Sequence, residues 1–132
     1  MHEDLHEMNL YPCAYSMTFN VTGNRLNAIL NQRSQDILAA NNWNVVQYSA
    51  LLMMFAQVSG LEPGELVHVI SDMHIYDRHI DMVKTMLDRE PLPEHKVRLN
   101  PEVKNFYDFT VDDFIVEDYE YGKSMGRVPV AI

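Results

Sequence analysis

The sequence contains a single cysteine, Cys13, and lacks the long apolar runs of a membrane protein. One cysteine excludes an intramolecular disulfide, which agrees with a reducing compartment. No run of about 18 apolar residues is present, so we predict no membrane-spanning helix. The first residues are acidic and contain histidine, unlike a signal or transit peptide. We therefore expect a cytoplasmic protein.

Positive charge is also scarce. The chain has 10 Lys and Arg residues against 19 Asp and Glu residues, which gives a formal net charge of −9. Proteins that bind duplex nucleic acid usually carry a basic face. The composition therefore argues against nucleic acid as a partner, although an anionic small ligand could bind where a few donors converge.

The apolar pattern predicts strands first and helices after them, within a single domain over residues 1–132. Residues 1–10 are polar, and we expect them to be loosely held. Alternating apolar residues from Tyr15 to Val21 predict a strand. A turn signal at residues 22–24 and a second extended segment from Arg25 to about Asp36 predict an antiparallel hairpin.

The later segments favour two helices and further strands. After a loop signal at residues 39–42, residues 43–59 have apolar positions around much of a helix, so we expect this helix to be central and buried. A turn at Pro63-Gly64 should lead into a buried strand at residues 66–76. Asp77 should then cap a second helix that ends near Leu87, and residues 97–99 should form a short strand. The fold class is α+β, with a mixed or antiparallel sheet packed on the long helix.

Two groups of residues could bind a phosphorylated ligand or attack it. Cys13 follows a proline, although a lone cysteine is more often a small buried apolar residue. Arg33 and Ser34 combine a guanidinium with a hydroxyl, which suits a phosphate. An exposed strand end explains the same residues without any ligand.

Two further groups could recognise a base or a sugar. Asn44 lies at the start of the long helix, and its amide can either read a pyrimidine edge or cap the helix. His74 and Tyr76 would point to the same side of a strand. They could bind one hydroxyl group together, or they could simply form a buried pair. The spacing of His74, His79 and Asp81 matches no zinc-binding pattern, so we expect no bound metal.

Read in order, these segments resemble thymidylate synthase over most of the chain. The resemblance rests on six motifs: Tyr11-Pro12-Cys13, Gln32-Arg33-Ser34-Gln35-Asp36 (Q-R-S-x-D), Asn44 with Tyr48 (N-x-x-x-Y), Asp72-Met73-His74-Ile75-Tyr76 (D-x-H-x-Y), Arg89-Glu90-Pro91, and the terminal Pro129-Val130-Ala131-Ile132. Residues 39–44 depart from the family's L-G-x-P-F-N. The matching part corresponds to the C-terminal, nucleotide-binding half of the family.

The resemblance implies a role for each motif. Cys13 would be the thiolate that attacks C6 of deoxyuridine monophosphate (dUMP), and Asn44 would hold the uracil edge. The remaining substrate-binding residues would be Gln32, which lines the pocket, Arg33 and Ser34 at the phosphate, and His74 and Tyr76 at the 3′-hydroxyl. Asp36 and Ala131 would contact the co-substrate methylenetetrahydrofolate, with residues 127–132 as a tail that closes over the bound ligands.

The resemblance also implies partners and leaves the activity of the chain open. Family members are homodimers, and residues 15–36 resemble their interface. A full-length member is about twice as long, so a separate chain or segment could supply the N-terminal half. Three readings follow: reductive methylation of dUMP, a catalytically incomplete nucleotide-binding remnant, or a related pyrimidine hydroxymethylase.

Overall fold

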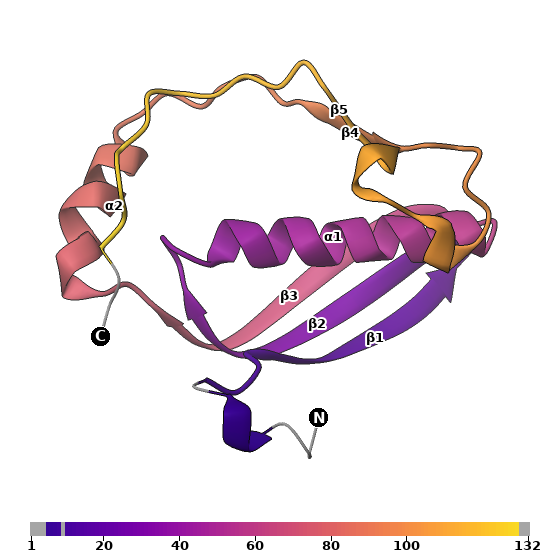
Figure 1. The fold of residues 1–132 in the computed structure, drawn as a ribbon, viewed down its shortest axis with the longest axis horizontal. Helices are drawn as coiled ribbons and strands as arrows, with labels where there is room; N and C mark the ends of the chain where they lie inside the picture. The colour runs from indigo at the N-terminus through magenta and orange to yellow at the C-terminus, as the bar shows by residue number, and fades with distance from the viewer. Residues whose placement is uncertain (1–4, 9, 130–132) are drawn as a thin grey trace.

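The computed structural model describes residues 5–8 and 10–129 and shows an α+β fold of two sheets and two α-helices (Figure 1). In chain order the elements are η1 (Leu5–Glu7), β1 (Ala14–Thr22), β2 (Arg25–Asp36), α1 (Asn41–Val58), β3 (Glu62–His74), η2 (Asp77–His79), α2 (Ile80–Leu87), β4 (Lys96–Leu99), η3 (Phe106–Asp108), η4 (Val111–Asp113) and β5 (Phe114–Glu117). The predicted strands at residues 15–21, 25–36 and 97–99 are confirmed.

The larger sheet is mixed, with strand order β1-β2-β3. β1 and β2 form the predicted antiparallel hairpin, and Gly23 takes a positive φ of 63° in its turn, where a side chain would be strained. β3 pairs with β2 in parallel. A parallel pair needs a long crossover connection, and α1 provides it.

The hydrophobic core lies between α1 and one face of this sheet (Figure 1). Leu26 and Ala28 of β2 pack against Leu52 and Ala56 of α1, and all four are buried. The Phe55 ring contacts Phe19 edge-on, with ring centroids 5.2 Å apart. α1 therefore packs across β2 and β3, with Phe55 reaching β1, and its N-terminus is directed to the end of β2.

α1 differs from the prediction in its start and in its burial. It begins at Asn41, inside the predicted loop at residues 39–42. Only one side of the helix faces the sheet, so Trp43 is 78% exposed and Val46 68% exposed. η3 covers the helix near its end, where the Phe106 ring stacks on Phe55 with centroids 4.8 Å apart, but the outer side at Trp43 and Val46 is exposed, so the expectation of a buried helix was wrong there.

β3 is longer and more exposed than predicted. Pro63 and Gly64 lie inside the strand, and not in a turn. The β2–β3 register shifts between Leu26 and Ala28, next to this point, and proline is tolerated in strands at such irregularities and at sheet edges. Val67 and Val69 are exposed, because they point away from α1 on a face that no second layer of described residues covers.

The remaining segments form an arc from the end of β3 back to the same region (Figure 1). The second helix is confirmed, but its first turn is the 3-10 segment η2, and Asp77 makes no capping hydrogen bond. β4 and β5 pair antiparallel in a separate sheet. Residues 118–129 then run back to lie beside α2, which returns the C-terminal segment to the end of β3.

Candidate functional site

The register of the larger sheet gathers the predicted site residues at one end. Ala14, next to Cys13, pairs with Gln32. Ser34 pairs with Asp72, and Asp36 pairs with His74. The start of β1, the ends of β2 and β3, and the start of α1 therefore meet at one edge, and β2 contributes four of the predicted residues.

Cys13 and Arg33 are neighbours across the β1–β2 pair. The backbone N–H of Arg33 donates to the Cys13 carbonyl at 2.9 Å. Its guanidinium donates to the carbonyls of Tyr11, at 2.6 Å, and Pro12, at 3.2 Å. Cys13 is half-buried and Arg33 is exposed. The arginine thus holds the backbone just before the thiol, and it still has N–H groups to spare, since a guanidinium carries five.

Gln32 is the centre of a buried amide network. Its side chain is 1% exposed. Its Nε2 donates to the Ser34 carbonyl at 2.8 Å and to Gln35 Oε1, and it lies 3.3 Å from Asn44 Oδ1. The contact with Asn44 joins two predicted substrate-binding residues from different elements.

The network continues through residues that the sequence analysis did not single out. Gln32 Oε1 can only accept a hydrogen bond, so the His68 Nε2 at 2.9 Å must be the donor, which assigns the tautomer of this histidine. Burial lowers the pKa of His68, because it disfavours the charged ring. On the other side, Gln35 Nε2 donates to Asn41 Oδ1 at 3.2 Å. His68 lies between Val67 and Val69 in the sequence, and nothing local there indicates its partner Gln32, thirty-six residues away.

Ser34 and His74 meet at the carboxylate of Asp72. Ser34 Oγ donates to Asp72 Oδ2 at 3.4 Å, and His74 Nδ1 lies 3.4 Å from the same oxygen. The rings of His74 and Tyr76 are in edge-to-face contact, with centroids 5.1 Å apart. The predicted phosphate and hydroxyl ligands are therefore adjacent, with a carboxylate between them.

Asp36 closes the end of β2. Its Oδ1 accepts from the backbone N–H groups of Leu38, at 3.0 Å, and Ala39, at 3.1 Å. These bonds shape the turn that leads to the first residue of α1. Asp36 Oδ2 lies 3.9 Å from Nδ1 of His79, a buried histidine to which the sequence analysis gave no role of its own.

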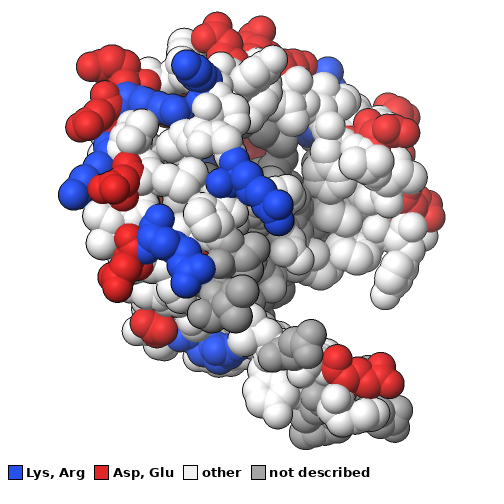
Figure 2. All heavy atoms as spheres, turned by 60° about the vertical axis from the view of Figure 1, so that its left-hand side comes forward, with Lys and Arg blue, Asp and Glu red and all other residues white. Residues whose placement is uncertain are grey.

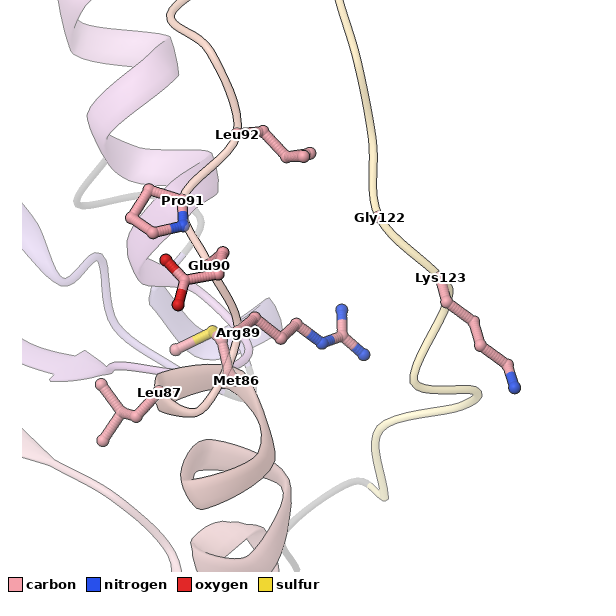
Figure 3. A pocket seen from close by; sticks show the side chains of 8 residues that line it. All are labelled: Met86, Leu87, Arg89, Glu90, Pro91, Leu92, Gly122 and Lys123. Carbon is pink, nitrogen blue, oxygen red and sulfur yellow. The ribbon is translucent and has the colours of Figure 1, made fainter.

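Other features lie outside this group of residues. Ala131 falls outside the described residues. A surface hollow of about 720 Å³ lies between the end of α2 and the segment with Gly122 and Lys123, and its lining contains none of the predicted site residues (Figure 3). In Figure 3 the Arg89 side chain extends from the end of α2 toward the segment that carries Gly122 and Lys123.

The distribution of charged and metal-ligating side chains among the described residues bears on two kinds of ligand, nucleic acids and metal ions. On the face seen in Figure 2, Lys and Arg side chains lie among Asp and Glu side chains, without a continuous basic surface. Within residues 5–8 and 10–129, no three His, Cys, Asp or Glu side chains are grouped to hold a metal ion. No helix in this described part is long and apolar enough to cross a membrane.

Comparisons with known proteins agree on one family. The thymidylate synthase family profile matches residues 1–132. Thymidylate synthase 1 of Bacillus amyloliquefaciens is 43% identical over 129 residues, 97% of this chain and 56% of that protein. The Bacillus mojavensis thymidylate synthase is 43% identical over 120 residues, 91% of this chain and 43% of that protein. The solved structure of the thermostable thymidylate synthase A from Bacillus subtilis superposes with a TM-score of 0.87 at 41% identity, covering 95% of this chain and 45% of that one. The chain spans about half the length of these relatives, and it belongs to the thymidylate synthase family.

Proposed function

We propose that this chain is the C-terminal, nucleotide-binding part of a thymidylate synthase and acts in the reductive methylation of dUMP by methylenetetrahydrofolate. One observation supports the proposal: seven predicted site residues, in or next to four elements, lie at one end of the larger sheet. They are Cys13, Gln32, Arg33, Ser34, Asn44, His74 and Tyr76. The N-terminal part would come from the same polypeptide or from a separate chain.

Cys13 is the nucleophile in this proposal. Its thiolate bonds to C6 of the uracil ring, and the ring electron pair moves to C5, which takes the one-carbon unit from the folate. C5 then loses its proton as the bond between the one-carbon unit and the folate nitrogen breaks, which leaves a methylene group on C5 and releases tetrahydrofolate. A hydride from tetrahydrofolate reduces the methylene to methyl as the thiolate leaves, which yields thymidylate and dihydrofolate. A thiolate is required because the thiol is a poor nucleophile. Arg33 is the cationic side chain attached to the segment that carries this thiol.

The phosphate would bind to Arg33 and Ser34. Arg33 can keep its bonds to the carbonyls of Tyr11 and Pro12 and still offer donors to an anion. Ser34 must turn its hydroxyl away from the Asp72 carboxylate to do so, because a hydroxyl has a single hydrogen to donate. His74 and Tyr76, next to Ser34, would bind the ribose hydroxyl.

The uracil edge would be read by Asn44. Gln32 Nε2 faces Asn44 Oδ1, and this arrangement leaves the Asn44 Nδ2 hydrogens for the uracil carbonyl O4. Cytosine presents an amino group at that position and would face a second donor. Asp36 keeps Oδ2 for the pterin of the folate, because its Oδ1 is occupied by the turn.

A homodimer through the open sheet face accompanies this proposal. Ile29, Val67 and Val69 are exposed apolar residues on the face opposite α1, and Ile29 and Val67 are register partners. A symmetric pair of such faces would bury them. This face includes the hairpin at residues 15–36.

The alternative is a nucleotide-binding remnant that cannot complete the reaction. Hydroxymethyl transfer to the same uracil nucleotide is the other variant, because residues 39–44 depart from the family pattern.

The test is covalent capture of the nucleotide. The chain is incubated with fluorodeoxyuridine monophosphate and methylenetetrahydrofolate and weighed intact by mass spectrometry. We expect an increase equal to both ligands, lost in Cys13→Ala. Nucleotide binding without an adduct would establish the remnant. Binding of neither ligand, alone or after addition of a thymidylate synthase N-terminal half, would contradict both readings.

A further inference from the structure

The end of the described C-terminal segment is fastened to the fold at His79. The Nε2 atom of His79 lies 2.7 Å from the Pro129 carbonyl, fifty residues away in the chain. A carbonyl oxygen only accepts, so Nε2 is the donor. In Figure 1 the C-terminal segment runs beside α2 toward the start of that helix.

His79 is placed to connect three parts of the molecule. It is 1% exposed and ends the 3-10 turn that leads into α2. Its ring contacts Tyr76 edge-to-face, with centroids 5.7 Å apart. Its Nδ1 lies 3.9 Å from Asp36 Oδ2 and has no hydrogen-bond partner among the described residues. The tail, the predicted hydroxyl ligand Tyr76 and the predicted folate ligand Asp36 therefore all border one imidazole.

Within residues 120–129, the bond to Pro129 adds to a weak apolar attachment. Between residues 120 and 129 only Met125 and Val128 are half-buried, and the others are exposed. Apolar burial thus holds this segment weakly. A hydrogen bond from a buried imidazole is stronger in effect, because breaking it leaves a buried N–H unpaired.

We propose that His79 is a positioning residue that fastens the C-terminal segment beside Asp36 by donating Nε2–H to Pro129. The fastening stands on the structure alone. Its consequence, that His79 supports folate binding without touching the nucleotide, rests on the proposed function.

The fastening is tested by trypsin cleavage after Arg127, the basic residue nearest to Pro129. His79→Phe keeps the ring contact with Tyr76 and removes the donor, whereas His79→Gln keeps an N–H at about the same reach. We expect cleavage after Arg127 to be about tenfold faster in His79→Phe and close to wild type in His79→Gln, since one buried hydrogen bond is worth about 1.4 kcal/mol, or tenfold.

Cleavage after Lys84, within α2, is the internal control, because it rises only if the helix itself opens. Equal rates after Arg127 in all three proteins, or equal acceleration in Phe and Gln, would overturn the proposal. If His79→Phe unfolds α2, deletion of residues 128–132 provides the second measurement. Hydrogen exchange of the His79 imidazole N–H, followed by NMR, should be at least about tenfold faster after the deletion, and an unchanged rate would equally overturn the proposal.

Ligand binding separates this proposal from the proposed function. In protein that forms the covalent adduct, His79→Phe should raise the folate dissociation constant about tenfold and leave that of dUMP unchanged. His79→Gln should restore folate binding. If no adduct forms at all, the proposed function fails, while the cleavage and exchange results still decide the fastening.

Discussion

At the scale of single residues, the orientation of the site amides starts from a backbone atom. The Ser34 carbonyl cannot rotate, so it determines which end of the Gln32 amide faces it. The Gln32 orientation then determines the His68 tautomer and the atom that Asn44 turns inward. The base-reading group is thus oriented by residues that would not touch the base.

His68 leads to a prediction about pH. Burial lowers its pKa in the folded protein, so the unfolded chain binds more protons below the ordinary histidine pKa of about 6.5. Folding stability should therefore fall as the pH drops through that value toward the folded pKa. Urea unfolding from about pH 7.5 to about pH 5.5 should show a greater loss in wild type than in His68→Gln. A constant difference between the two proteins would contradict this assignment.

At the scale of elements, the contact between β2 and β3 depends on a close approach at Gly64. A Cβ at this position would collide with the Asn27 side chain and lie 2.8 Å from the Leu26 carbonyl. The same Asn27 Oδ1 accepts the backbone N–H of Glu65 at 2.9 Å. Glycine at residue 64 therefore allows β3 to follow the irregularity in β2, where the sequence pattern indicated a turn.

Gly64→Ala should accordingly lower the free energy of unfolding by about 1–3 kcal/mol, as overpacking against backbone does. Gly122→Ala is the matched control, because its Cβ would meet only Arg89 Nη1 at an ordinary 3.6 Å. We expect the control to remain within about 0.5 kcal/mol of wild type. Denaturant unfolding measures both, and equal stability of the two variants would refute the close approach.

At the scale of the whole molecule, apolar surface is left uncovered on two sides. Trp43 and Val46 lie on the outer side of α1, and Ile29, Val67 and Val69 lie on the opposite face of the sheet. Extended apolar patches on a folded protein usually mark interfaces. For the sheet face, the proposed partner is a second copy of this chain.

Val67→Lys should weaken that dimer, because two charges would be brought together across a symmetric interface. Val111→Lys is the control, since Val111 is exposed in η4, away from the larger sheet. Sedimentation equilibrium should give a dissociation constant at least about tenfold higher for Val67→Lys, a loss of about 1.4 kcal/mol. A monomeric wild type, or equal constants in both variants, would show that this face is not the interface.

The local elements were readable in the sequence because they depend on short-range signals. The alternation of apolar with polar or smaller residues predicted β1 and β2, and Gly23 marked the turn between them. Apolar residues at helical spacing predicted both helices. The motifs at Cys13, Arg33, Asn44 and His74 could be named for the same reason. Each is a short segment whose residue types and spacing are visible without any partner.

Only the tertiary structure decided how these segments meet. Whether Pro63-Gly64 turns or continues depends on the backbone of β2 beside it, and the burial of α1 depends on which elements cover it. The Gln32 network and the His79–Pro129 bond join residues far apart in the chain, and such contacts leave no local pattern. Sequence periodicity reports which face of an element is apolar, whereas only packing determines what that face meets.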